Sequence, residues 1–322
     1  MAESKMSSDA EVTSSLASQV FKHRDASSYD LLTDEFDRFT SRLSHPLAAR
    51  LISLAQLKPA DRVLDIGTGT GIVALQAAPI VSNGGTVLGI DLSDGMLAAA
   101  KAKAVQAGVS DRVEFGKMDA EALDLPDRSF DVVLSLFALY HFPNPLAALK
   151  EMFRVLRPGG RLVIGVGSGP RLLSVTGLTH SVKRLHDILL KLQGKQLIAP
   201  GFLNALVERY FPEPEHSEET HLAREGAHSA GGVWPLVRSA GFHDLRSDWA
   251  GHQAYLDTPE EYWDIQRTFS SLARKRLSAA PPEKVDQLRE DFLITCKRVQ
   301  GRGGRLTYPV AAYYVVAHRP SV

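Results

Sequence analysis

Residues 63–71 read Val63-Leu64-Asp65-Ile66-Gly67-Thr68-Gly69-Thr70-Gly71, a pattern typical of a buried strand that ends in an acid and turns through glycines into a helix. Glycine adopts positive φ easily and has no Cβ, so the chain can turn sharply here and approach a ligand at the carboxyl end of the strand. The stretch therefore predicts an α/β fold with a nucleotide-like ligand on this loop. The expected contacts are Asp65, Gly67, Thr68, Gly69 and Gly71.

Two details separate this loop from loops that bind dinucleotides. The dinucleotide pattern G-x-G-x-x-G requires a third glycine where Ile72 stands, and its helix N-terminus receives a doubly charged pyrophosphate. Asp65, two residues before the first glycine, would repel a phosphate but attract an ammonium group. S-adenosylmethionine fits these requirements, because it carries an ammonium, a sulfonium, a ribose and an adenine but no phosphate.

A second predicted strand, over residues 86–91, also ends in an acid. Asp91 follows Gly67 by 24 residues, close to the spacing of roughly 20 residues at which a carboxylate accepts hydrogen bonds from ribose hydroxyls. Leu92 and Met96 come next, at the start of a helix, and are expected to line an adenine slot. Asp91 suits both nicotinamide and S-adenosyl cofactors and does not discriminate between them.

Acids also follow the third predicted strand, over residues 113–119. Asp119 is expected to accept a hydrogen bond from the adenine amino group, and together with Glu121 it disfavours a polyphosphate nearby. Ala120, between them, and Leu136, at the end of a fourth strand over residues 130–136, complete the expected cofactor contacts.

Strands and helices alternate five times along this part of the chain. A helix from Pro145 to Leu156 stops at Arg157-Pro158-Gly159-Gly160, and a fifth strand follows over residues 161–166. This alternation predicts a mainly parallel sheet with both faces covered by helices.

Residues 63–166 resemble a class I S-adenosylmethionine-dependent methyltransferase, of the group that includes the ubiquinone/menaquinone-biosynthesis C-methyltransferases and many natural-product methyltransferases. The motifs that carry this resemblance are residues 65–71, 89–93, 119–126 and 154–160. It implies a Rossmann-like, seven-stranded mixed sheet, mainly parallel, whose antiparallel last strand (residues 307–318) lies at the edge. It also implies S-adenosylmethionine as cofactor, S-adenosylhomocysteine as product, and an aromatic at the place of Tyr29 near the methionine end. Core packing of Tyr29 is the equal alternative.

The resemblance covers about a third of the chain, and the rest is expected to elaborate the fold. The expected segments are a flexible leader (1–20), an N-terminal lid of two helices (21–57), the cofactor-binding core (58–169), a helical substrate cap (170–231), a core continuation with a sixth strand (232–257), a second helical insertion (258–302) and the last strand (303–322). In the second insertion, Thr258 is a good N-cap before Pro259.

Composition excludes several functional classes. The 322 residues include 37 basic and 37 acidic side chains, whereas a nucleic-acid substrate would need a basic face. Cys296 is the sole cysteine, so neither a disulfide within the chain nor a cysteine-ligated metal site is expected. No stretch has the roughly 18 apolar residues of a membrane span. We expect a cytoplasmic protein without nucleic-acid partners, and a homodimer stays open.

Aromatic side chains are frequent in the predicted insertions and beside them. Such walls suit a small, flat or greasy acceptor of the quinone, phenol, polyketide or glycoside type, although helix packing explains most single aromatics equally well. The Asn/Asp-Pro-Pro-aromatic motif of amino-group methylation is absent, because Ser135-Leu136-Phe137-Ala138 stands there, so oxygen or carbon is the expected target. The aromatics concerned are Phe202, Tyr210, Phe211, Trp234, Trp249, Tyr255, Trp263 and Phe269.

His141 is the expected catalytic base. It lies five residues beyond the strand 130–136, beside the expected methyl position, and histidine transfers protons near neutral pH. A structural role before Pro143 is the alternative. Other histidines are weaker candidates, and a metal site is not expected, even at the acidic cluster with His216 and His221. The weaker candidates are His180, His186, His243 and His252.

Two other functions stay open. A relative of this fold can bind the sulfonium for pericyclic or other non-methyl chemistry, or bind it without turnover, and release of S-adenosylhomocysteine distinguishes these outcomes from methyl transfer. A nicotinamide dehydrogenase is disfavoured by Asp65, Ile72 and Asp119.

Overall fold

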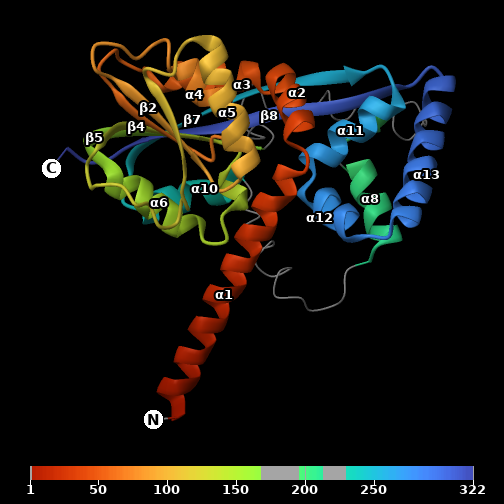
Figure 1. The fold of residues 1–322 in the computed structure, drawn as a ribbon, viewed down its shortest axis with the longest axis horizontal. Coiled ribbons are helices and arrows are strands. Elements are labelled where there is room, and N and C mark those ends of the chain that lie inside the picture. Colours follow the sequence, from red (N-terminus) through yellow and green to blue (C-terminus); the bar gives the residue numbers. More distant parts are fainter. Residues whose placement is uncertain (1, 168–195, 200, 213–229, 322) are drawn as a thin grey trace.

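The computed structural model describes residues 2–167, 196–199, 201–212 and 230–321, and in these residues one eight-stranded sheet forms the centre of the molecule (Figure 1). Five parallel strands lie in the order β3-β2-β1-β4-β5, and β8 follows beside β5. The alternating α/β fold expected from residues 63–166 is thereby confirmed. The strands are β1 (Arg62–Ile66), β2 (Thr86–Asp91), β3 (Val113–Lys117), β4 (Phe130–Leu136), β5 (Leu156–Gly167), β6 (Gln196–Ile198), β7 (His243–Leu256) and β8 (Arg305–His318).

The last strand is antiparallel to β5, as expected, but it does not lie at the edge of the sheet. Ala312 pairs with Gly167 of β5 on one side and with Ala250 of β7 on the other. A run of buried residues in β8 explains this position, because a strand covered on both faces and both edges is apolar throughout. The expected count of seven strands was also too low, since β6, inside the first insertion, pairs with the start of β8.

Helices cover both faces of the sheet (Figure 1). Successive strand residues point to opposite faces, so that Val63 packs in the core under α3, α4 and α5, and Leu64 packs in the core over α6 and α10. The helices are α3 (His45–Ala55), α4 (Ile72–Ala77), α5 (Asp94–Ala107), α6 (Pro145–Val155) and α10 (Ala230–Ser239).

The N-terminal segment is more helical than expected. Helix α1 (Ala2–Asp30) includes nearly all of the segment 1–20 expected as a flexible leader, and its N-terminal part extends away from the body of the molecule (Figure 1). No glycine or proline interrupts residues 2–30, and alanine, glutamate, lysine and methionine in it favour a helix. Helices α2 (Thr33–Leu43) and α3 follow, so residues 21–57 hold parts of three helices instead of two.

The second insertion is helical, as expected. It contains α11 (Pro259–Phe269), α12 (Ser271–Ala279) and α13 (Pro282–Gly301), and Thr258 caps α11 by accepting a hydrogen bond from the Glu261 amide at 3.1 Å. These helices pack with α8 (Gly201–Tyr210) of the first insertion beside the sheet (Figure 1). Much of the first insertion, including His180 and His186, lies outside the described residues, as do His216 and His221.

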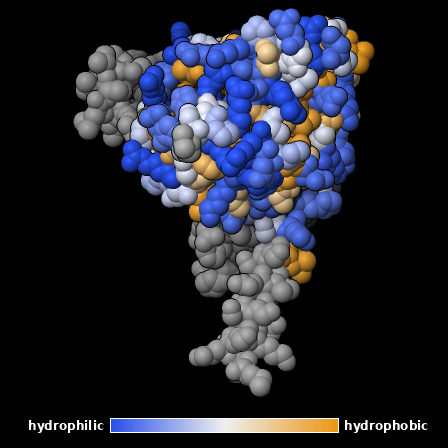
Figure 2. All heavy atoms as spheres, turned by 90° about the vertical axis from the view of Figure 1, so that its left-hand side faces the viewer, coloured by the Kyte–Doolittle hydropathy of each residue, from blue (hydrophilic) through white to orange (hydrophobic). Residues whose placement is uncertain are grey.

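Polar side chains dominate the face of the molecule shown in Figure 2, with apolar residues scattered among them. None of the helices in the described ranges combines the length and the hydropathy needed to cross a membrane.

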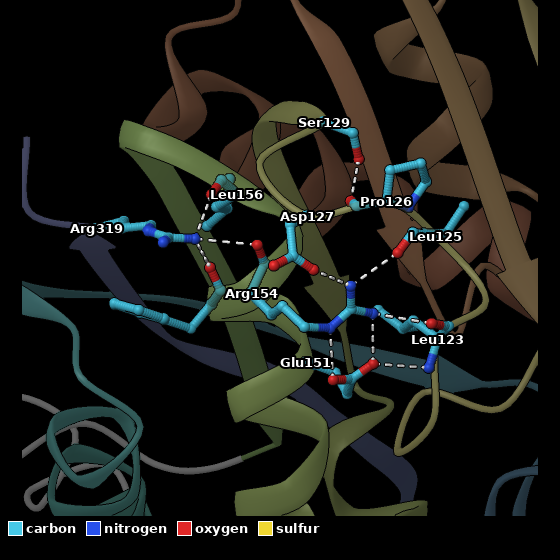
Figure 3. Close-up of polar contacts among 10 residues, drawn as sticks. Leu123, Leu125, Pro126, Asp127, Ser129, Glu151, Arg154, Leu156 and Arg319 are labelled. Atoms are coloured by element: carbon cyan, nitrogen blue, oxygen red, sulfur yellow. Dashed lines mark hydrogen bonds and ion pairs between the residues drawn. The ribbon is translucent and has the colours of Figure 1, made fainter.

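Arg154, in the last turn of α6, ties this helix to the loop that precedes β4 (Figure 3). Its Nε and Nη2 donate to both carboxylate oxygens of Glu151 at 2.8 and 2.7 Å, and Nη1 donates to the carboxylate of Asp127 at 2.6 Å. The same guanidinium donates to the carbonyl oxygens of Leu123 and Leu125, each at 2.8 Å. The hydrogen bonds from Arg154 to Glu151 hold the pKa of Glu151 below its usual range.

Replacing Arg154 with methionine should lower the free energy of unfolding by roughly 2–4 kcal/mol, because it leaves two carbonyls without their donor and the partly buried Glu151 carboxylate with the Leu123 amide alone. Chemical denaturation followed by circular dichroism measures this change. Arg112→Met is the matched control, since Arg112 pairs with its exposed neighbour Asp111, and its cost should stay below about 0.5 kcal/mol. Equal costs for the two variants would contradict the structural role of Arg154.

Candidate active site

A cavity of about 380 Å³ lies at the carboxyl edge of the parallel strands. Its floor is formed by the loops after β1, β2, β3 and β4, and α1 and α2 pass over it. Phe269, at the end of α11, and residues 308–311 of β8 close the remaining side. Ligands of open parallel sheets bind at this edge, beside the point where the strand order reverses.

The glycine loop lies in the cavity wall, except for its last residue. Gly67, Thr68 and Gly69 line the cavity, and a Cβ on Gly67, which has φ +68°, would lie only 2.2 Å from the Ala138 Cβ. Gly71 does not line the cavity; it is the N-cap residue of α4 and has φ +85°. Its place in the sequence pattern therefore reflects the turn into the helix rather than contact with the cavity.

Asp65 is buried at the end of β1 and has a free carboxylate oxygen. Its Oδ2 accepts hydrogen bonds from the Thr68 hydroxyl at 2.7 Å and from the Ala74 amide at 3.2 Å, whereas Oδ1 has no partner among the described residues. Burial raises the pKa of Asp65 to about 7, although both hydrogen bonds act to lower it. A cationic group on a ligand would favour the ionised form of this carboxylate.

Asp91, at the end of β2, is held in place by backbone amides. The amide of Gly69 donates to Oδ2 at 2.9 Å, and the amide of Ser93 donates to Oδ1 at 3.0 Å. Burial raises the pKa of Asp91, although these donors act to lower it. Each oxygen keeps a lone pair for a further donor, so the carboxylate can accept two ligand hydroxyls.

The far end of the cavity has apolar walls and one acid at its rim. Leu92, Met96 and Ala120 line it, together with Met118. Asp119 also lines the cavity and accepts a hydrogen bond from Lys22 Nζ at 2.8 Å. These side chains leave an apolar slot beside a carboxylate.

Glu121 does not line the cavity, in contrast to its expected role. Its carboxylate pairs with Lys22 Nζ at 2.6 Å and accepts a hydrogen bond from the Asn144 amide at 2.7 Å. Burial disfavours the charged amine of Lys22, but its hydrogen bonds to Asp119 and Glu121 hold its pKa above the usual value. Glu121 thus fastens α1 to the core.

His141 lies in a chain of hydrogen bonds that begins at a residue the sequence analysis missed. Asp25 Oδ2 on α1 lies 2.9 Å from His141 Nδ1, and the Tyr29 hydroxyl lies 3.2 Å from His141 Nε2. Asp25 is 5% exposed, and its Oδ1 pairs with Lys275 Nζ at 3.0 Å. Burial acts to raise the pKa of Asp25, but His141, Lys275 and Arg274 together hold it well below its usual range.

No motif surrounds Asp25 in the sequence, which explains why it was missed. It lies 116 residues from His141, and only the packing of α1 across the cavity brings the two together. The one available signal was the spacing of Asp25 and Tyr29, which places both on nearly the same face of a helix. His141 and Tyr29 both line the cavity.

Few of the expected aromatic residues lie at the cavity. Phe269 lines it, together with Tyr29, Phe36 and Tyr308, and Phe36 contacts Tyr29 and Phe269 edge-on at centroid distances of 5.4 and 5.5 Å. The remaining expected aromatics, Phe202, Tyr210, Phe211, Trp234, Trp249, Tyr255 and Trp263, are not in its wall. Of the weaker histidine candidates in the described residues, neither His243 nor His252 lines the cavity.

Known proteins similar to this chain agree with the site. Residues 64–164 match a family described as a methyltransferase domain. The chain is 39% identical over 142 residues to the ubiquinone/menaquinone biosynthesis C-methyltransferase UbiE of Ectopseudomonas mendocina, covering 44% of this chain and 54% of that protein. It is 36% identical over 176 residues to the 27-O-demethylrifamycin SV methyltransferase of Amycolatopsis mediterranei, covering 54% of this chain and 61% of that protein.

Among solved structures, the YcgJ protein of Bacillus subtilis is similar with a TM-score of 0.53 and 19% identity, over 86% of this chain and 99% of that one. This similarity supports the fold alone. The chain spans between half and two thirds of the length of the two curated relatives.

Asp91→Asn should weaken binding of S-adenosylmethionine, because an amide carries no charge and one of its two polar atoms is a donor instead of an acceptor. Calorimetric titration should show a loss of affinity of about 10- to 100-fold, as expected for hydrogen bonds to a charged group worth 1.5–3 kcal/mol. Asp94→Asn is the control, because Asp94 is on the adjacent helix and pairs with the exposed Lys117. Unchanged affinity in Asp91→Asn would remove Asp91 from the cofactor site.

Affinity for S-adenosylmethionine should fall as the pH drops below about 7, the pKa to which burial raises Asp65. The pKa of Asp65 in the folded state lies above its pKa in the unfolded chain, so the contribution of this group to stability falls as the pH rises towards about 7. The proton on Asp65 must leave when an ammonium binds. Between about pH 7 and 5 the affinity should fall by up to about tenfold per pH unit, while an α-amino group with a pKa near 8 stays charged. Titrations of Asp65→Asn should show no such slope; parallel profiles for the two proteins would contradict the assignment.

Proposed function

Because residues 64–164 are a class I S-adenosylmethionine-dependent methyltransferase domain, we propose that this chain transfers a methyl group to an oxygen or carbon atom of a small, largely apolar acceptor. The observation that carries the proposal is the hydrogen-bonded chain Asp25–His141–Tyr29 in the wall of the cavity that the glycine loop lines. It supplies a base where an acceptor would lie.

The polar groups of the cavity fit S-adenosylmethionine. The free Oδ1 of Asp65 suits the ammonium, and the buried hydroxyls of Thr40 and Thr70, which have no partner in the described chain and line the cavity, suit the carboxylate. Asp91 suits the ribose, and Asp119 suits the adenine amino group beside Leu92, Met96 and Ala120. Gly67, Thr68, Gly69 and Leu136 complete the cofactor wall.

When bound, S-adenosylmethionine supplies an electrophilic methyl group. The residues of this chain prepare the acceptor: its proton passes to the Tyr29 oxygen as the Tyr29 proton passes to His141 Nε2. Asp25, 2.9 Å from Nδ1, holds the neutral ring with Nε2 as an acceptor and stabilises the imidazolium that forms. Because the Tyr29 hydroxyl lies 3.2 Å from Nε2, His141 acts through Tyr29 in this proposal.

The acceptor is an apolar, flat molecule in this proposal. Phe36, Phe269 and Tyr308 provide aromatic walls, while the basic side chain in the lining, Lys22, is already paired with Asp119 and Glu121. Phenols and quinols combine such a shape with an acidic proton near the reacting atom. The names of the two curated relatives, a quinone-biosynthesis enzyme and a rifamycin enzyme, support this class.

The roles of the other parts of the chain are proposals of the same kind. Helices α1–α3 form a lid, the described parts of the two insertions form a substrate cap, and β7 and β8 continue the core. A cytoplasmic location, the absence of a nucleic-acid partner and assembly into a homodimer also belong to the proposal.

Tyr29→Phe and His141→Asn should each lower kcat by about 10²- to 10⁴-fold, the usual contribution of a general base, with little change in the affinity for S-adenosylmethionine. Turnover is measured as S-adenosylhomocysteine release together with mass spectrometry of the methylated acceptor, using a panel of phenols and quinols. His45→Asn is the matched control, because His45 begins α3 and is not in the cavity wall.

Either variant at full turnover would remove its residue from the mechanism. Tight cofactor binding by the parent protein, with an altered acceptor but no release of S-adenosylhomocysteine, would instead favour the non-methyl chemistry that the fold also permits.

A further inference from the structure

Arg274, in helix α12 of the second insertion, is a buried cation without an acidic partner. Its side chain is 3% exposed and forms no ion pair with a carboxylate in the described chain. Nη1 donates to the Thr268 carbonyl at 2.6 Å, Nε donates to the Ser28 hydroxyl at 3.3 Å, and Nη2 has no partner. Burying a charge that forms no ion pair is costly, so the position of Arg274 points to a function.

The guanidinium of Arg274 stacks on the ring of Tyr29. Its Cζ lies 3.8 Å from the ring centroid, well within the distance at which a cation and an aromatic face attract each other. Burial raises the pKa of Tyr29 to about 12, and the charge of Arg274 opposes that rise. The cation therefore lies where it stabilises negative charge on the phenol.

The next residue of α12 acts at the other end of the same chain of hydrogen bonds. Lys275 Nζ pairs with Asp25 Oδ1 at 3.0 Å, while Asp25 Oδ2 faces His141. Asp25 also acts on Tyr29, because its negative charge raises the pKa of the phenol, and Asp91 of β2 acts in the same direction. Tyr308 of β8 is the further titratable group beside Tyr29. Lys275 and His141 are the direct partners of Asp25, whereas the charge of Arg274 acts on that carboxylate without forming an ion pair with it in the described chain.

Transfer of the Tyr29 proton to His141 would create two charges at once. The imidazolium would form beside the carboxylate of Asp25, and the phenolate would form under the guanidinium of Arg274. Both opposite charges are in place before the proton moves, and neither needs to reorient. The buried cation is thus explained by a charge that exists only during the reaction.

We propose that Arg274 is a positioning residue that acts through Tyr29: it stabilises the phenolate form of Tyr29, so that the second insertion takes part in the chemistry as well as in closing the cavity. The inference rests on the proposed function, because it assigns Tyr29 a part in taking up the acceptor proton. The protons balance, because the Tyr29 proton moves to His141 Nε2 and the acceptor proton takes its place on the Tyr29 oxygen.

The test is a titration of position 29 that needs no turnover. In the full-length chain, Tyr29 is replaced by 3-fluorotyrosine, whose hydroxyl is more acidic than that of tyrosine and whose fluorine resonance reports ionisation. Arg274→Gln removes the charge but keeps a donor for the Thr268 carbonyl, Arg274→Met is a second neutral variant, and Arg274→Lys keeps the charge. Arg276→Met, two residues further along α12, is the matched control.

The neutral variants should raise the titration midpoint at position 29 by about 1 pH unit or more, and Arg274→Lys by less than half as much. With unmodified Tyr29, they should lower kcat about tenfold or more while the KM for S-adenosylmethionine stays within about threefold. Arg276→Met should change neither quantity. Whichever neutral variant folds, as judged by circular dichroism, supplies the result.

An unshifted midpoint in a folded neutral variant would overturn the role of Arg274, even if its turnover fell, because packing alone would then explain the loss. A shifted midpoint in a protein that methylates no acceptor would count against the proposed function instead. The two failures are therefore distinguishable.

Discussion

The contact between Asp25 on α1 and His141 after β4 is the interaction on which the site depends. Lys22, Asp25 and Tyr29 lie where a docked helix usually presents apolar residues, and the Asp25 contact brings this polar face of α1 against His141. In the proposed relay the carboxylate selects the ring nitrogen that carries the proton, and the other nitrogen faces Tyr29. The proposed lid and the proposed base are thus joined by one contact.

The parallel sheet positions two further acids of the cavity. Asp65 and Asp91 end neighbouring strands, and their buried carboxylates are held by backbone amides and a threonine hydroxyl instead of by cations. Such carboxylates keep affinity for positive or hydroxyl-bearing groups, whereas Asp25 is already neutralised by Lys275. In the proposed function these two kinds of acid divide the cavity into a cofactor-binding part and a proton-accepting part.

The core could be predicted from the sequence because its signals are local. Each signal spans only a few residues: the glycine loop, the acids at strand ends and the helix stop at residues 157–160. The bounds of β1 to β5 agree with these signals. The contribution of α1 and α12 could not be predicted, since Asp25, His141 and Arg274 meet only through tertiary packing. The position of β8 was wrong for a related reason: pairing with β7 depends on a strand separated from it by the whole second insertion. Glu121 belongs to the motif of residues 119–126, but its carboxylate pairs with Lys22 instead of lining the cavity.

The most direct test of this account is the protonation state of the His141 ring, measured by nitrogen NMR of labelled protein near neutral pH, with His141→Asn identifying the resonances. We expect a proton on Nδ1, held by Asp25, and an unprotonated Nε2 that accepts a hydrogen bond from the Tyr29 hydroxyl. In Asp25→Asn the preference for this tautomer should disappear. A proton on Nε2 in the parent protein would contradict the proton relay and leave His141 a structural residue.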